Sequence, residues 1–383
     1  MPAFKSRIES ALAERKTQGL SRSMNVVFAG NQSVLEHEGR RYINFSSNDY
    51  LGLANDQALV RAWQQGLSVY GSGSGASPMV TGFSAAHSNL EAALTEWLGY
   101  DRAILFGSGF SANQALLFTL LEKSDVLIQD RLNHASLMEA GALSPAKMKR
   151  FKHNDIEHLK SLINSEDNHL VVTEGVFSMD GDCAPLSDIA KVTRSHDAWF
   201  AVDDAHGIGV LGQSGGGSCE LATVKPEILI VTFGKAFGMS GAAILCDHAT
   251  GDFLTQFARH HVYSTAMPPA QAYALTHAVS MVQEQSWRRE KLSELSEVYR
   301  DCLSDLEGFV ETQTSIKPFV IGESELALQV ASACRQNGIW VTAIRPPTVP
   351  KGTSRLRITL TANHTNEQVK TLSMALKQAL GAL

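Results

Sequence analysis

The sequence predicts an α/β fold in which a large domain holds a mainly parallel seven-stranded sheet and a smaller α+β domain follows at the C-terminus. Between residues 46 and 265, short apolar runs alternate with helical patterns. Buried runs of four to seven apolar residues separated by helices are typical of a parallel sheet covered by helices. After residue 265 the pattern changes to a long helical stretch, short strands and two further helices. A chain of 383 residues is also long enough for two or three domains.

The N-terminal arm, residues 1–45, begins with a helical pattern over its first twenty residues. A hairpin follows at 34–45 with Gly39 in its turn, and a helix is expected at 56–70 after a polar stretch. The strands expected in the large domain, 46–265, are 103–106, 126–130, 149–153, 169–175, 199–204, 228–234 and 241–246. Its helices are expected at 111–122, 134–142, 155–163 and 186–196.

The C-terminal part, residues 266–383, begins with a helical stretch over 268–306 that links it to the large domain. Short strands are expected at 318–321, 340–344 and 355–360, and helices at 323–337 and 365–380. Their mixed order indicates an α+β domain.

The bulk composition excludes several classes of protein. A net charge of −6 without a basic stripe argues against nucleic-acid binding. The five cysteines are dispersed, the closest two being Cys219 and Cys246, so neither a disulfide framework nor a metal site is expected. The chain begins without an apolar secretory segment and has no apolar run of about 18 residues. We therefore expect a cytoplasmic protein that does not enter a membrane.

The glycine-rich segment 107–112 matches the pattern G-x-G-x-x-A between a strand and a helix. Asp130 ends the next strand, where an acid of a dinucleotide site would bind ribose. An NAD-dependent oxidoreductase is therefore one interpretation. The physical content is broader, because a helix N-terminus after a glycine turn binds any phosphate. A tight turn without a ligand is the third possibility.

Two other glycine clusters are less specific. Residues 71–75 follow a helix, so they form either a loop lining a site or a plain linker. Residues 212–216 match G-x-S-x-G, but more glycine follows where the nucleophile elbow of a hydrolase requires a helix. This argues against a serine hydrolase.

Three segments with reactive side chains follow apolar strands of the expected sheet. Lys235 lies among small residues in TFGKAFG, where its amine could form a Schiff base or could simply face solvent. Asp203 and His206 lie in VDDAHG, where the acid suits a buried cation such as a pyridinium nitrogen. A metal pair or a helix cap are the alternatives there. His134 in DRLNHAS could stack on a planar ring or be an ordinary surface histidine.

In order along the chain, the motifs GSGF, DRLNHAS, TEGVFSMDGD, VDDAHGIGVLG and TFGKAFG resemble those of the α-oxoamine synthases. The resemblance extends almost from end to end. It implies the fold of the pyridoxal-phosphate (PLP) enzymes of fold type I, PLP as cofactor, and a homodimer. These enzymes are acyltransferases that condense a small amino acid with an acyl thioester.

Within that family, the stretches HNDIEHL, RHHVYSTAMPPAQA and TAIRPPTVP are most similar to the enzyme of biotin biosynthesis. The resemblance therefore implies L-alanine and a pimeloyl thioester as substrates, carried by coenzyme A or by an acyl-carrier protein. Use of glycine with acetyl- or succinyl-coenzyme A, and synthesis of a long-chain α-aminoketone, are the alternatives inside the family.

The resemblance also implies roles for individual residues. Lys235 would bind the cofactor covalently and serve as acid and base, and Asp203 would pair with the ring nitrogen. The remaining cofactor contacts would come from His134 on the ring face, His206 near the phenolic oxygen, and Gly109, Phe110, Ser178 and Thr232 at the phosphate and nearby oxygen atoms. Arg357 would bind the carboxylate of the amino acid. The other substrate contacts would be Asn48, from the same chain or from a second subunit, and Arg22, Arg345 and Thr348 along the acyl channel.

Overall fold

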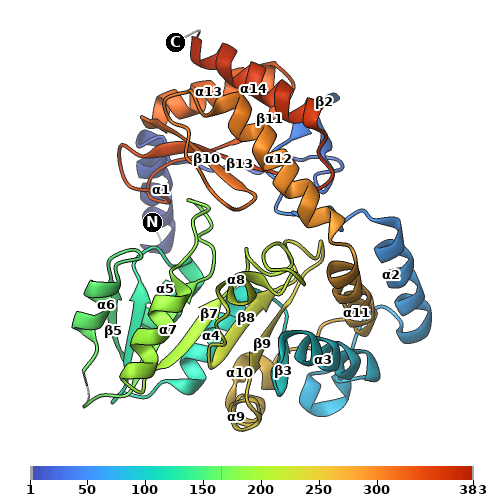
Figure 1. Ribbon diagram of the computed structural model, residues 1–383, viewed down its shortest axis with the longest axis vertical. Coiled ribbons are helices and arrows are strands. Elements are labelled where there is room, and N and C mark those ends of the chain that lie inside the picture. Colours follow the sequence, from blue (N-terminus) through green and yellow to red (C-terminus); the bar gives the residue numbers. More distant parts are fainter. Residues whose placement is uncertain (1–2, 165, 382–383) are drawn as a thin grey trace.

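The computed structural model describes residues 3–164 and 166–381. It consists of a lower part, built on the large sheet, and an upper part, formed by the N-terminal hairpin together with the C-terminal strands and helices (Figure 1). The lower part is built on a seven-stranded sheet in the order β3-β9-β8-β7-β6-β4-β5. Its strands are β3 (Arg102–Phe106), β4 (Val126–Asp130), β5 (Lys147–Phe151), β6 (His169–Glu174), β7 (Trp199–Asp203), β8 (Ile228–Thr232) and β9 (Ala242–Cys246). Only β9 runs antiparallel to its neighbours β3 and β8. The prediction of a mainly parallel sheet of seven strands is confirmed.

Helices cover both faces of this sheet (Figure 1). They are α3 (Ala85–Leu98), α4 (Gly109–Leu120), α5 (Ala135–Leu143), α6 (Ile156–Leu162), α7 (Leu186–Ser195), α8 (Gly217–Ala222), α9 (His248–Phe257) and α10 (Arg259–Val262). The sequence analysis did not identify α3, α8, α9 or α10. The signal for α3 was present, because Leu90 and Leu94 have helical spacing and are both buried.

Four more helical segments lie around the junction of the two parts: α1 (Ala3–Thr17), α2 (Gln57–Tyr70), α11 (Pro269–Glu284) and α12 (Trp287–Leu303), with a π-helical turn at Pro78–Gly82. The expected helix over 268–306 is therefore two helices. Gln285 at the break has φ −101° and ψ 61°, which is not helical. Its side chain accepts a hydrogen bond of 2.7 Å from Nε of Arg288, so the break brings this arginine back toward the preceding helix. No helix in the described part of the chain is both long and apolar enough to cross a bilayer.

The upper part joins the start of the chain to its end. In one sheet, β1 (Val34–His37) and β2 (Arg40–Asn44) form the expected hairpin, and β2 pairs in parallel with β11 (Ile339–Trp340). In the other, β13 (Ser354–Thr359) lies between β10 (Ile316–Gly322) and β12 (Thr342–Ile344). The helices α13 (Ser324–Gln336) and α14 (Asn366–Gly381) cover these sheets. The division into an arm and two domains stays a prediction, but the hairpin of the arm is bonded to the C-terminal part.

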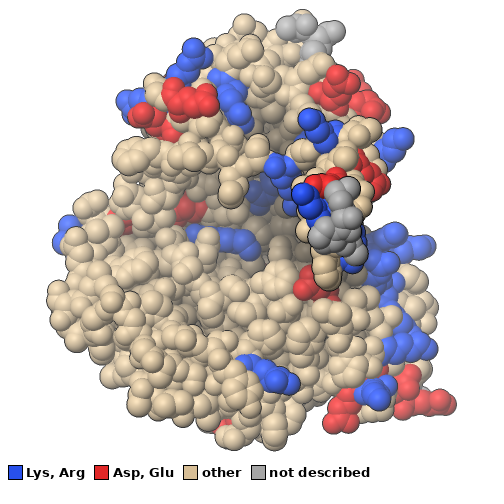
Figure 2. Space-filling model, turned by 180° about the vertical axis from the view of Figure 1, so that it is seen from behind, with Lys and Arg blue, Asp and Glu red and all other residues tan. Residues whose placement is uncertain are grey.

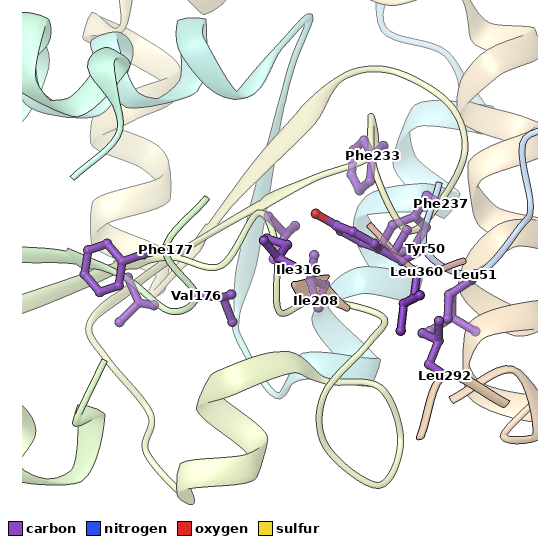
Figure 3. Packing of buried hydrophobic residues seen from close by; sticks show 14 of the residues in the cluster. Tyr50, Leu51, Val176, Phe177, Ile208, Phe233, Phe237, Leu292, Ile316 and Leu360 are labelled. Atoms are coloured by element: carbon purple, nitrogen blue, oxygen red, sulfur yellow. The ribbon is translucent and has the colours of Figure 1, made fainter. Parts of the chain in front are cut away.

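The turn that carries Lys235 is held rigidly in the core between the two parts. Phe233 and Phe237 on either side of it are fully buried, with ring centroids 5.5 Å apart, and lie near Tyr50 and Leu51 (Figure 3). Gly238 has φ +67°, and a Cβ there would lie 2.2 Å from the nitrogen of Ala54. Only glycine fits this conformation and this close approach.

An ion pair between a buried arginine and a partly exposed aspartate fastens α12 to the same region. Arg288 is 4% exposed, and its guanidinium donates to Asp56 over 2.6 Å and to the carbonyl of Leu51 over 2.7 Å.

Replacement of Arg288 should lower the stability of the protein. Because Arg288→Ala leaves the buried carbonyl of Leu51 without this donor and removes the ion pair with Asp56, the free energy of unfolding should fall by about 1–3 kcal/mol in urea titrations. Arg300→Ala on the same helix is the control. Arg300 makes only an exposed contact of 3.9 Å with Asp301, so it should change stability by less than about 0.5 kcal/mol. Equal effects of the two changes would contradict this account.

Candidate active site

The candidate site lies at the edge of the large sheet where its parallel strands end. Asp203 and Thr232 are the last residues of β7 and β8, and His134 caps the helix that follows β4. Gly109 begins the helix after β3, and Lys235 lies in the turn after β8. Parallel strands deliver their carboxyl ends to one edge, where α/β sheets bind ligands.

A cradle for a phosphate lies where α4 begins. The first N–H groups of a helix have no partner within it, and here they belong to Gly109 and Phe110. A Cβ on Gly109 would lie 2.6 Å from Cγ2 of Thr232, so any larger residue here would have to displace the Thr232 side chain. Within the described residues, the buried Oγ1 of Thr232 has no hydrogen-bond partner. A buried hydroxyl without a partner beside free N–H groups fits an anionic ligand.

Asp203 supplies a buried acid close to this cradle. It is 5% exposed, and its carboxylate accepts hydrogen bonds from Nδ2 of Asn113 over 2.8 Å and from the N–H of Ala205 over 3.1 Å. Asn113 also donates to Oγ of Ser136 over 2.9 Å, which fixes its amide. A carboxylate oriented in this way can pair with a protonated ring nitrogen. Asn113 was not singled out from the sequence, since an asparagine inside a helical pattern gives no signal for this contact.

The amine of Lys235 has no acceptor among the described residues, although Asp203 and Glu174 are close enough to act on it. Burial lowers the pKa of Lys235, and the Arg357 guanidinium acts in the same direction. The two carboxyl groups act in the opposite direction. The net effect is a larger fraction of free amine near neutral pH than for a lysine in water, as an attack on an aldehyde requires.

Glu174 is a further buried acid that the sequence analysis did not identify. It ends β6 directly opposite Asp203 and is 3% exposed, and its Oε1 has no partner among the described residues. Burial, with the neighbouring Asp203, raises the pKa of Glu174 well above its ordinary value. Burial and Asp203 thus favour the neutral form of Glu174, which reduces the repulsion between the two adjacent carboxyl groups.

The two histidines of the site are both neutral at pH 7. Burial lowers the pKa of His206 well below its usual value, and the positive charges of Lys235 and Arg357 act in the same direction. Its Nδ1 lies 2.6 Å from the hydroxyl of Tyr50, whose pKa is raised to about 12 by burial. That hydroxyl keeps its proton at neutral pH and shares one hydrogen bond with Nδ1. Loss of water around the ring also lowers the pKa of His134, against the opposing effect of Asp203.

Arg357 on β13 reaches the same region from the upper part. Its Nε donates to the backbone carbonyl of Ser178 over 2.7 Å, and one terminal nitrogen donates to Oδ1 of Asn48 over 3.0 Å. The hydroxyl of Tyr50 lies 3.4 Å from the same amide oxygen. Asn48 and Tyr50 therefore connect Arg357 to His206. The arginine is 8% exposed and is thus aligned before any ligand arrives.

The remaining predicted substrate residues form a separate group. Arg22, Arg345 and Thr348 line a cavity of about 400 Å³ together with Arg15. Arg345 also donates to the carbonyl of Gly19 over 2.9 Å. Seen from behind, the molecule is hollowed between its upper and lower parts, and Lys and Arg side chains border the hollow (Figure 2). Thr342 on β12 also lines this cavity and pairs in register with Arg357 on β13. The cavity is therefore connected to Arg357 through the sheet.

The residues behind the rival interpretations have structural partners. Asp130 is fully buried and accepts hydrogen bonds from the N–H groups of Leu132 and Asn154, so it is not open to a ribose. Ser214 in the G-x-S-x-G segment donates to Glu220 over 3.0 Å. The loop 71–75 packs on the segment before α11, where Ser74 donates to the carbonyl of Ala266 over 2.7 Å.

Comparison with known proteins agrees with this geometry. Residues 40–376 match the family described as aminotransferase class I and II. The chain belongs to this family. It is 92% identical to the 8-amino-7-oxononanoate synthase of Vibrio campbellii over the full length of both chains, and 64% identical to that of Vibrio cholerae over 98% of each. PLP is therefore its cofactor, as the resemblance implied, and the NAD interpretation is wrong.

Solved structures lead to the same family. A serine palmitoyltransferase of S. paucimobilis, solved with PLP bound, is 27% identical with a TM-score of 0.91, covering 98% of this chain and 97% of that one. The 8-amino-7-oxononanoate synthase of Francisella tularensis is 29% identical with a TM-score of 0.78, covering 89% and 98%. The predicted fold is confirmed, while the roles of the individual site residues stay predictions.

The phosphate cradle can be tested by adding one methyl group. Gly109→Ala should push the Thr232 side chain aside and weaken PLP binding by about tenfold or more, the loss of one hydrogen bond to a charged group. The measurement is titration of apoprotein with PLP, followed by fluorescence. Gly107→Ala is the matched control, because nothing lies within 4 Å of its added Cβ. Equal affinities of the two variants would contradict the cradle.

Proposed function

We propose that this site condenses L-alanine with a pimeloyl thioester to give 8-amino-7-oxononanoate, CO₂ and the free thiol carrier. The identity to 8-amino-7-oxononanoate synthases over the whole chain supports this reaction. The observation that carries the chemistry is the partly accessible amine of Lys235, which has no hydrogen-bond acceptor among the described residues and is acted on by the charges of Asp203, Glu174 and Arg357. In the reaction, a bond forms between the α-carbon of alanine and the thioester carbonyl carbon as the C–S bond breaks. The bond to the carboxylate then breaks and releases CO₂.

The residues of the sheet edge fit PLP group by group. When bound, PLP supplies an aldehyde that condenses with amines and a conjugated ring that delocalises the electron pair left on the α-carbon. Gly109, Phe110 and Thr232 would hold its phosphate, and Asp203 would keep its ring nitrogen protonated. His134, which stays accessible at the N-terminus of α5, would lie against the ring face.

Arg357 and Lys235 divide the work on alanine. The guanidinium of Arg357 binds the carboxylate, since its planar fork matches two oxygen atoms and Ser178 and Asn48 already hold it in place. Lys235 takes the proton from the α-carbon and returns one after CO₂ has left. A lysine whose pKa is lowered toward the working pH is suited to both directions of transfer, worth about 10²–10⁴-fold in rate.

The acyl substrate would occupy the cavity between Arg22, Arg345 and Thr348. Both ends of a pimeloyl thioester are anionic, one through its free carboxylate and the other through the phosphate groups of its carrier. Three arginines around one cavity, including Arg15, suit such a molecule. The upper part of the protein lies over the sheet edge (Figure 1), and an acyl chain bound between the two parts would help to keep water from the reacting carbon.

The reaction is tested by offering glycine, L-alanine and L-serine with acetyl, succinyl, pimeloyl and long-chain thioesters, on coenzyme A and on acyl-carrier protein. We expect L-alanine with pimeloyl to give the highest kcat/KM and a product with the mass of 8-amino-7-oxononanoate. Lys235→Ala should form no product above background. Borohydride should attach the cofactor covalently to a peptide containing Lys235 in the wild type only. Preference for glycine or for a long-chain acyl group would assign the chain to another α-oxoamine synthase activity.

We also propose that the chain acts as a homodimer. Several large apolar side chains near the cofactor end of the sheet are exposed: Met79 (47%), Val80 (74%), Phe83 (44%), Phe110 (39%) and Tyr263 (77%). The π-helical turn and α10 contact each other, and α10 also contacts α4, so these residues lie on adjoining elements. Apolar side chains gathered on one surface are a feature of subunit interfaces.

A charge on this surface should separate the subunits. Val80→Asp should shift the mass measured by light scattering from twice the chain mass toward the chain mass, because an interface core excludes an unpaired carboxylate. Met374→Asp on α14 is the control, since Met374 is 64% exposed but lies on another face. A wild type with the mass of one chain would refute the homodimer.

A further inference from the structure

A second group of charged side chains lies next to the candidate site and takes no part in the proposed chemistry. His153 follows β5, and both of its ring nitrogens face carboxylates. Nδ1 lies 3.1 Å from Oδ1 of Asp130, and Nε2 lies 2.8 Å from Oδ2 of Asp182. An ionised carboxylate only accepts hydrogen bonds, so both nitrogens must donate and the ring must carry two protons. His153 is thus an imidazolium between two anions.

Asp182 belongs to the loop 175–183, which connects β6 to the segment before α7. The loop is folded on itself, with the N–H of Phe177 donating to the carbonyl of Asp182 over 2.9 Å. The ring of His153 also meets Phe177 edge to face, with centroids 4.4 Å apart. Asn154 adds a hydrogen bond of 2.9 Å to the carboxylate of Asp182. The end of β5 therefore holds one side of the loop through charge and through packing.

The other side of the loop reaches the upper part of the protein. The carbonyl of Ser178 accepts from Nε of Arg357 over 2.7 Å, and the carboxylate of Asp180 pairs with Arg355. The carbonyl of Gly181 accepts from the hydroxyl of Thr314 over 2.8 Å. The loop is therefore a link between the two parts, and its position determines where the acceptor for Arg357 lies.

We propose that His153 is a positioning residue for the amino-acid substrate. Its doubly protonated ring fixes the loop 175–183 to the large sheet, and the loop in turn orients Arg357 toward the carboxylate of L-alanine. This inference rests on the proposed role of Arg357. Asn154 beside His153 also binds the carboxylate of Asp182, whereas Asp180 and Gly181 bind to the upper part.

The charges around His153 favour the doubly protonated ring. Asp130 from β4 and Asp182 from the loop are the charged groups that face it, and no lysine or arginine forms an ion pair with either within residues 3–164 and 166–381. Burial opposes the charge, but the two carboxylates outweigh it and raise the pKa of His153 to about 10. The contribution of the charged ring to the free energy of unfolding is complete below about pH 6.5, the pKa of a free histidine. It is lost as the pH rises through about 10.

The test compares His153→Gln with wild-type holoenzyme. A loop that is no longer held should raise the KM for L-alanine about tenfold, while the KM for the pimeloyl thioester and kcat at saturating alanine stay within about twofold. Hydrogen exchange, measured on the same proteins, should become faster in peptides covering 175–183 and stay unchanged in β6. His196→Gln is the matched control, because that histidine is exposed at the end of α7 and, among the described residues, its side chain hydrogen-bonds only to the carbonyl of Val192 and the hydroxyl of Ser195.

Two further measurements test the role of His153. Asp182→Asn removes one of the two anions and should give a smaller effect of the same kind. This variant replaces His153→Gln if the latter does not fold. The stability of the wild type in urea should fall between pH 7 and pH 10, and this fall should be smaller in His153→Gln. An unchanged KM for L-alanine, or an equal loss of affinity for both substrates, would overturn the inference. A wild type that does not use L-alanine would instead refute the proposed function.

Discussion

The site depends on one constraint, which is that the parallel strands of the large sheet end at the same edge. Glu174, Asp203 and Thr232 are the last residues of three adjacent strands, so they are brought together by strand order alone. The helix that begins at Gly109 opens at the same edge because β3 also runs in that direction. Removing water from so many polar groups raises the free energy of the folded state, and each group is accommodated in a different way. The pKa of Glu174 is raised, Asp203 accepts two hydrogen bonds, and Lys235 has a lowered pKa.

The upper part of the protein completes the site without contributing to the sheet. Arg357 comes from β13 but is held by Asn48 from the polar stretch before α2 and by Ser178 from the loop after β6. Three distant segments of the chain therefore meet at one guanidinium. Such an arrangement selects a substrate carboxylate by geometry, since the arginine is already fixed when the ligand arrives. The same contacts couple the two parts of the molecule at the point where the amino acid binds.

Much of the fold could be predicted because its signals are local. The strands at 126–130 and 228–232 are wholly buried, and their sequences begin with the apolar runs VLI and ILIV. Lys235 and Asp203 could be found because both follow apolar runs, Lys235 directly after Gly234 and Asp203 shortly before Gly207. The partners of these residues could not, since Asn113 meets Asp203 across 90 positions and Tyr50 meets His206 across 156. The pairing of β2 with β11 and the break at Gln285 also depend on tertiary contacts that no short window contains.

The parallel pairing of β2 with β11 has a consequence for how the chain is made. Ile43 is bonded in register to Ile339, so the N-terminal hairpin cannot take its place until nearly the whole chain has left the ribosome. At roughly 5–20 residues per second, the hairpin waits for about 15–60 s with an unpaired edge. The strands of the large sheet are all synthesised within that interval. Translation thus builds the cofactor-binding part first, and the amino-acid site is closed only when the last hundred residues emerge.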